Sequence, residues 1–89
     1  MEKFYVLEDY SFADGRTDKQ YFPYESESEA MSAIHDHYNS ITDVFDEQGC
    51  KYRSALSLSS AWVASKGSHC RTWIETDRGD YIEIYVVEM

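Results

Sequence analysis

A chain of 89 residues, 43% hydrophobic and 16% aromatic, with one proline and four glycines, has the composition of one small folded domain. This composition excludes a disordered tail, a collagen-like repeat and a flexible linker, which lack aromatic residues or carry far more proline and glycine. Seventeen acidic residues against eight basic ones give a net charge of −9, which repels phosphate backbones and anionic lipid. We therefore expect a single domain over residues 1–89 that binds neither nucleic acid directly nor a membrane.

The first segment has the alternation of a strand with apolar residues on both faces, from Lys3 to Tyr10. Residues 11–18 have turn composition, and Asp14-Gly15 is the expected pivot. The segment from Lys19 to Tyr24 then reads as a short return strand, in which Pro23 marks an end or an edge position. The chain therefore begins with a predicted β-hairpin.

The next segment has the periodicity of a helix, which we place at about residues 27–46. Ser26 followed by Glu29 fits a capping box at its start, and we expect Gly49 to end it. One apolar stripe is expected to face the core. It comprises Ala30, Ile34, His37 or Tyr38, Ile41, Val44 and Phe45.

From Tyr52 to Met89, three strand-like runs are separated by residues 65–67 and 77–79. If each loop has three residues with glycine in the left-handed conformation, Ile74 pairs with Ile82 and with Leu58. One clean apolar face then results. It collects Leu56, Leu58, Trp62, Cys70, Thr72, Ile74, Ile82, Ile84 and Val86. These runs predict a meander of three antiparallel strands.

The element order β-β-α-β-β-β predicts an α+β fold of two layers, in which one α-helix packs on an antiparallel β-sheet of about five strands. No signal peptide is expected, because Glu8 and Asp9 break the first apolar run, and no apolar stretch approaches the length of a membrane span. Cys50 and Cys70 are too few for a disulfide scaffold. These features favour a cytoplasmic protein with reduced thiols.

Acidic residues gather in the predicted helix. Residues 25–47 contain seven acids and no lysine or arginine: Glu25, Glu27, Glu29, Asp36, Asp43, Asp46 and Glu47. Such a run has two interpretations. The acids keep a small protein in solution, or they form a surface that matches a basic groove and takes the place of phosphates.

The sequence contains no arrangement typical of catalysis or metal binding. His35 and His37 lie two residues apart on a helix and therefore point in different directions, and His37 fits a half-buried core histidine. A zinc site would need one of them to meet His69, Cys70 or Cys50 in space. No nucleotide-binding loop, nucleophile elbow or calcium-binding loop is present. We expect no enzyme activity, no metal and no cofactor.

The chain also has eight tyrosines and two tryptophans. Strand propensity explains many of them. The sheet face away from the helix is nevertheless expected to show aromatic residues suited to an interface. The residues concerned are Trp73, Tyr81, Glu83 and Tyr85. Homodimerisation through this aromatic face is the simplest functional interpretation.

Size, charge and the absence of catalytic motifs together favour a small acidic protein that acts by binding another macromolecule. The sharper hypothesis is an inhibitor of the kind that phages and mobile elements use against restriction or CRISPR nucleases. Its partner would be a nuclease or other nucleic-acid-binding protein with a basic groove. The alternatives are a homodimeric adaptor that uses the aromatic face, and a small-ligand or metal-binding domain with a pocket near His37, Cys70 and Trp62.

Overall fold

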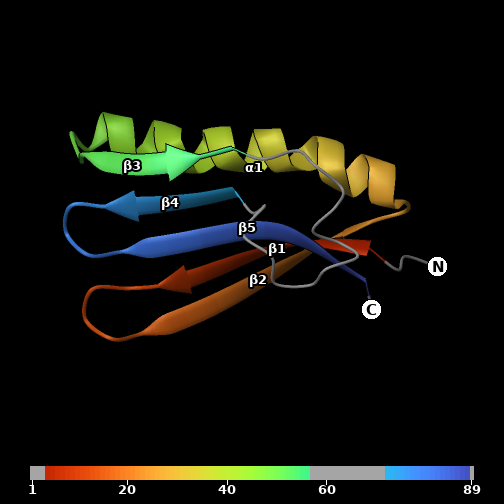
Figure 1. Cartoon of the computed structure of the whole chain (residues 1–89), viewed down its shortest axis with the longest axis horizontal. Coiled ribbons are helices and arrows are strands. Elements are labelled where there is room, and N and C mark those ends of the chain that lie inside the picture. The colour runs from red at the N-terminus through yellow and green to blue at the C-terminus, as the bar shows by residue number, and fades with distance from the viewer. Residues whose placement is uncertain (1–3, 57–71, 89) are drawn as a thin grey trace.

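The computed structural model describes residues 4–56 and 72–88, which form one helix on one face of a five-stranded antiparallel sheet (Figure 1). The elements are β1 (Phe4–Ser11), β2 (Thr17–Tyr24), α1 (Glu27–Glu47), β3 (Tyr52–Ala55), β4 (Thr72–Thr76) and β5 (Tyr81–Glu88). The predicted α+β fold, with the order β-β-α-β-β-β, is confirmed. The predicted first hairpin and the helix agree with the observed bounds within two residues.

The strands of the sheet follow the order β2-β1-β5-β4-β3. The first and last strands of the chain therefore lie side by side, and β1 pairs along its whole length with both β2 and β5. Helix α1 packs mainly against β5 and β1. The core consequently lies between the helix and the three strands β1, β5 and β4.

The turn between β4 and β5 sets the register of the C-terminal hairpin. Gly79 has φ of +100°, the left-handed region that favours glycine, and Ile74 aligns with Ile82 as the three-residue loop predicts. The turn between β1 and β2 lies next to it, because the Ala13 N–H donates to Asp80 Oδ1 over 2.9 Å. Both turns lie at the end of the molecule that also holds the C-terminal end of α1 (Figure 1).

Two predictions about the start of the meander are wrong. Ile74 aligns with Ser54 on β3, and not with Leu58, and β3 ends at Ala55. The turn expected over residues 65–67 lies outside the described residues. Leu56, predicted in the apolar face, is 39% exposed because it lies beyond the last paired residue of β3. Leu58, Trp62 and Cys70 lie outside the described residues.

Helix α1 has the ends that its sequence predicts. The Glu29 N–H donates to the Ser26 side-chain oxygen over 3.1 Å, which satisfies one of the free amides of the first turn. At the other end Gly49 has φ of +69°, and its N–H donates to the Asp46 carbonyl. The Cys50 N–H donates to the Phe45 carbonyl, which completes a Schellman motif.

Gly49 provides a test of this helix end. A Gly49→Ala variant is expected to lose about 1 kcal/mol of unfolding free energy, because an alanine Cβ strains the left-handed conformation. No atom other than its chain neighbours lies within 4 Å of a Cβ at this position, so the loss measures backbone strain alone. Urea unfolding should show that Gly49→Asn retains most of the stability, since asparagine tolerates this conformation. Equal losses in the two variants would contradict this account.

Most core side chains come from the predicted faces of helix and sheet, and Met31 and Ala33 of α1 join them from outside the predicted stripe. The buried cluster consists of Val6, Ala30, Met31, Ala33, Ile34, Ile74, Ile82, Ile84 and Val86. Thr72, also predicted in the apolar face, is 1% exposed. Val44 departs from the prediction, since this member of the apolar stripe is 49% exposed. It lies near the C-terminal end of α1 and lines an open pocket there.

Candidate functional site

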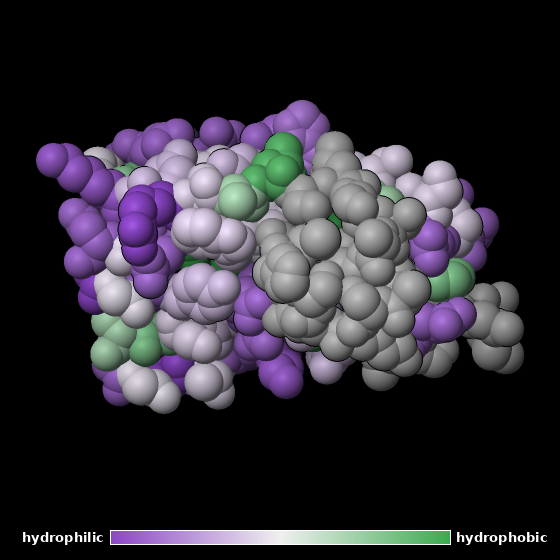
Figure 2. Space-filling view, in the orientation of Figure 1, coloured by the Kyte–Doolittle hydropathy of each residue, from purple (hydrophilic) through white to green (hydrophobic). Residues whose placement is uncertain are grey.

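The structure places the seven predicted acidic residues along α1 and the residue pair before it. Glu27 is half-buried, and the other six are exposed: Glu25, Glu29, Asp36, Asp43, Asp46 and Glu47. Figure 2 shows hydrophilic side chains along the edge of the molecule that α1 forms, at the top of the view. The predicted exposed acidic surface on a helix is therefore present.

These seven acids have no lysine or arginine partner among the described residues. In that part of the chain, the ion pairs with arginine join Arg16 to Asp14, Arg53 to Glu75 and Arg78 to Asp80. Of the seven, Asp46 accepts a hydrogen bond from the Tyr52 hydroxyl over 3.2 Å. Within the described residues, the negative charge of α1 is therefore not neutralised by neighbouring side chains.

Four of the acids form one row along the outside of the helix. A helix turns by about 100° per residue, so Glu29, Asp36, Asp43 and Glu47 fall within about 40° of one another around its axis. At about 1.5 Å per residue, the row extends over about 27 Å. We call these four residues the acidic row.

The aromatic face also forms where it was predicted, on the side of the sheet away from α1. Trp73 on β4 and Tyr81 on β5 are stacked, with ring centroids 6.4 Å apart and an interplanar angle of 25°. Glu83 aligns with Trp73 across the two strands, and Tyr85 lies two residues further along β5. All four side chains are half-buried.

A polar network that the sequence did not predict connects the sheet to the helix. Glu8 on β1 is only 6% exposed, and one of its carboxylate oxygens lies 2.5 Å from His37 Nδ1 on α1. Its other oxygen accepts a hydrogen bond from the Tyr10 hydroxyl over 2.6 Å. His37 Nε2 lies 3.0 Å from the Tyr24 hydroxyl, and the Phe22 ring packs 4.6 Å from the imidazole. His37 is half-buried, as predicted.

The chain Tyr24–His37–Glu8 has the connectivity of a hydroxyl, a base and an orienting carboxylate. Since a carboxylate only accepts, Nδ1 carries the proton, and Nε2 of a neutral imidazole then accepts from Tyr24. Burial raises the pKa of Tyr24, and the carboxylates of Asp36 and Glu8 raise it further. This direction is opposite to the one that activates a nucleophile. The network connects α1 to the sheet through hydrogen bonds at Glu8, His37 and Tyr24.

Glu8 could have been found in the sequence by the alternation of β1. Phe4, Val6, Glu8 and Tyr10 occupy every second position, so a charged residue stands on the face that packs against the helix. His37 stands at a core position of the helix stripe. One titratable residue on each of two packed faces is a signal of a buried pair.

Tyr10 provides a test of the network. Its pKa is raised above the ordinary value, first by burial, then by its hydrogen bond to Glu8 and by the charges of Glu8 and Asp18. Because the folded state holds this proton more tightly, the stabilisation is complete below the ordinary tyrosine pKa of about 10 and is lost as pH rises through the folded-state pKa. Urea unfolding between roughly pH 9 and 11 should therefore show falling stability.

A Tyr10→Phe variant is expected to lose less stability over this pH range than the wild-type protein does. Tyr21→Phe is the matched control, because Tyr21 is 47% exposed, and it should keep the wild-type pH dependence. A Tyr10→Phe variant with the wild-type dependence would show that another group governs the alkaline loss of stability.

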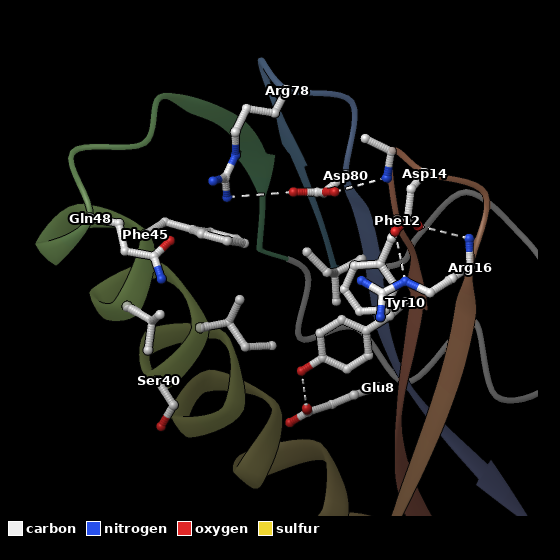
Figure 3. A pocket seen from close by; sticks show the side chains of 14 residues that line it. Glu8, Tyr10, Phe12, Asp14, Arg16, Ser40, Phe45, Gln48, Arg78 and Asp80 are labelled. Carbon is white, nitrogen blue, oxygen red and sulfur yellow. Dashed lines mark hydrogen bonds and ion pairs between the residues drawn. The ribbon is translucent and has the colours of Figure 1, made fainter.

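An open pocket lies where the C-terminal half of α1 meets the two hairpin turns (Figure 3). Its volume is about 690 Å³, within the range of roughly 300–1,000 Å³ typical of ligand sites. The helix provides one wall with Ser40, Ile41, Val44, Phe45 and Gln48. Glu8, Tyr10 and Ile82 line it from β1 and β5, and Figure 3 shows the Tyr10 hydroxyl directed at Glu8.

The two hairpin turns form the rim of this pocket. Phe12 stacks on Tyr10 with ring centroids 5.7 Å apart, and the Arg16 guanidinium lies 5.1 Å from the Phe12 ring centroid. Arg16 pairs with Asp14 over 2.7 Å, and Arg78 lies 3.5 Å from Asp80. The hydrogen bond between Ala13 and Asp80 holds the two turns together. The rim is therefore polar, and the interior is mostly apolar.

The location of the pocket differs from the one expected for a small-ligand domain. His37 does not line it, and Cys70 and Trp62 lie outside the described residues. The described residues contain no group of three or more histidine, cysteine or acidic side chains that could hold a metal ion. Cys50, which is half-buried, is a free thiol. No helix of the described chain combines the length and the apolar character that a membrane crossing requires.

Fold and site together define a small α+β protein. Its helix carries an acidic surface that no lysine or arginine of residues 4–56 and 72–88 neutralises, and a mostly apolar pocket lies at the end of that helix. Comparison with protein-family models, with curated proteins and with solved structures finds no match.

Proposed function

We propose that this protein is a non-enzymatic inhibitor that presents the outer surface of α1 to the basic groove of a nucleic-acid-binding protein. The observation that supports this most is the acidic row, four exposed carboxylates on one side of a 21-residue helix without a lysine or arginine partner in the described part of the chain. A nuclease encountered by a phage or mobile element, of the restriction or CRISPR type, is the partner class we favour.

The spacing of the acidic row suits imitation of a phosphate backbone. Glu29, Asp36 and Asp43 are separated by seven residues each, or about 10.5 Å of helix. One strand of B-DNA advances about 3.4 Å per phosphate, so each interval matches about three nucleotides. A rigid helix holds these charges in place before binding, which reduces the ordering cost of association.

The placement of acids at the C-terminal end of α1 also supports a role in binding. The negative end of the helix dipole favours cations, and an unfavourable charge there costs about 0.3–1 kcal/mol. The last turn nevertheless has no basic residue and carries Asp46 and Glu47. Solubility alone is served as well by mixed charges, which also gain stabilising i,i+4 pairs. A surface selected for negative potential accounts for this arrangement.

The proposal is tested by competition with DNA. A fluorescein-labelled duplex is bound to a guide-loaded CRISPR nuclease or to a restriction enzyme, and fluorescence anisotropy follows its displacement by the intact protein. Because the interaction is between opposite charges, displacement should be efficient at about 50 mM salt and weaken by about tenfold or more at 200 mM. Displacement that is independent of salt, or no displacement across a panel of such enzymes, would reject the proposal.

A further inference from the structure

The pocket at the end of α1 adjoins the acidic row, and the same helix carries both. Asp43 and Glu47 belong to the row. Ser40 and Val44 line the pocket and lie three residues before Asp43 and Glu47, which makes each pair neighbours on the helix surface. A partner that covers the C-terminal half of the row therefore also covers the pocket entrance. Val44 is 49% exposed at that entrance, and contact with an apolar group would remove it from water.

We propose that this pocket receives an aromatic side chain of the partner protein that is flanked in its sequence by lysine or arginine. The inference rests on the proposed function, since it assigns a specific anchor to the partner that the acidic row attracts. The pocket then supplies contact area and orientation, which charge alone does not supply.

The shape and lining of the pocket favour an aromatic group. The stacked rings of Tyr10 and Phe12 form one side, and Phe45 lies on the helix opposite (Figure 3). Val44 of the same helix also lines the pocket. Aromatic rings gain from stacked or edge-on contact with one another, beyond the gain from burial. A volume of about 690 Å³ has room for an aromatic side chain together with part of the backbone that carries it.

The charges around the entrance favour basic residues beside that aromatic group. Arg16 is paired with Asp14, and Arg78 faces Asp80, so the basic side chains of the rim are both opposed by carboxylates. Asp43 and Glu47 on the helix have no such basic partner among the described residues. The negative end of the helix dipole, which lies at this end of α1, also favours basic residues. Acidic or neutral residues beside the aromatic group of the partner would gain less binding free energy here.

Three short peptides separate these contributions without knowledge of the partner. Acetyl-Lys-Trp-Lys-amide has the proposed chemistry, acetyl-Lys-Ala-Lys-amide lacks the ring, and acetyl-Glu-Trp-Glu-amide reverses the charge. Titration of the ¹⁵N-labelled 89-residue chain, followed by NMR, should show shifts at the amides of Val44 and Phe45 with the first peptide. The dissociation constants of the other two should be higher by about tenfold or more.

Two protein variants show whether the pocket is the site. Val44→Trp places a large side chain at the entrance and should weaken binding of the Lys-Trp-Lys peptide by about tenfold. His35→Trp is the matched control, since His35 is exposed on the same helix and does not line the pocket. The control should bind as the wild-type protein does.

Equal binding of the Lys-Ala-Lys and Lys-Trp-Lys peptides would overturn the inference, because the pocket would then contribute nothing. Normal binding by Val44→Trp would also overturn it, and so would indole binding as tightly as the Lys-Trp-Lys peptide. The DNA displacement experiment tests the acidic row separately, because it reports on salt dependence and needs no aromatic anchor. Failure of the pocket and failure of the proposed function are therefore distinguishable.

Discussion

Replacing Asp36, Asp43 and Glu47 together with lysine is expected to abolish displacement of DNA from the target nuclease. Each reversal changes the net charge by two, so the protein goes from −9 to −3 while the middle and the end of the acidic row become positive. Like charges would then face each other across the interface, at a cost of several kcal/mol. The anisotropy competition should require about 100-fold more of this variant, or show no displacement at all.

The fold should survive these substitutions. The three side chains are exposed, and lysine is a good helix former whose charge is favoured near a helix C-terminus. Circular dichroism and urea unfolding check this directly, so that loss of inhibition is not mistaken for loss of structure.

A second triple variant separates surface position from net charge. Asp18→Lys, Asp77→Lys and Glu88→Lys also give −3, but these exposed residues lie on β2, the second hairpin turn and the end of β5. This control should still displace DNA, because it loses only the modest contribution that long-range attraction makes to binding. Equal losses in the two triple variants would mean that total charge, and not the acidic row, attracts the partner. Loss of binding in Trp73→Ala, with none in the helix variant, would favour the aromatic face as the interface.

A Glu8→Ala variant is expected to lose about 2–6 kcal/mol of unfolding free energy, because each of two buried donors left without an acceptor costs about 1–3 kcal/mol. The substitution leaves His37 Nδ1 and the Tyr10 hydroxyl without their acceptor in a site where Glu8 is 6% exposed. For a domain of this size such a loss is a large part of the total stability. Urea unfolding followed by far-UV circular dichroism measures it.

Two further variants assign this effect to the network. Glu8→Gln keeps the shape and one acceptor oxygen, so it should lose less stability than Glu8→Ala. Glu88→Ala removes an exposed carboxylate from a strand end and should change stability by no more than about 0.5 kcal/mol. A Glu8→Ala loss as small as that of Glu88→Ala would mean that His37 and Tyr10 find other partners.

The candidate site was only partly predictable. Seven acids without a basic residue between positions 25 and 47 are visible in the sequence, and their helix is confirmed. The acidic row follows once the helix is accepted, because its rotation per residue is fixed. The pocket could not be predicted, since its lining comes from a helix, two strands and two turns that are separated by up to 74 positions, from Glu8 to Ile82.

The sequence by itself determined the local elements of this protein. Alternation defined β1 and β5, Ser26 and Gly49 set the ends of α1, and Gly79 fixed the register that aligns Ile74 with Ile82. Each of these features depends on residues a few positions apart, where steric limits and hydrogen bonding leave few conformations.

Only the tertiary structure decided which distant residues meet. The pairing of β1 with β5, the contact of Glu8 with His37 and the exposure of Val44 depend on how the helix lies across the sheet. Hydrophobic burial drives that packing, and it has no preferred direction. The pattern of apolar residues therefore specifies which face is covered, but not which strand lies beneath which turn. The buried contact between Glu8 and His37 and the pocket are consequences of that single arrangement.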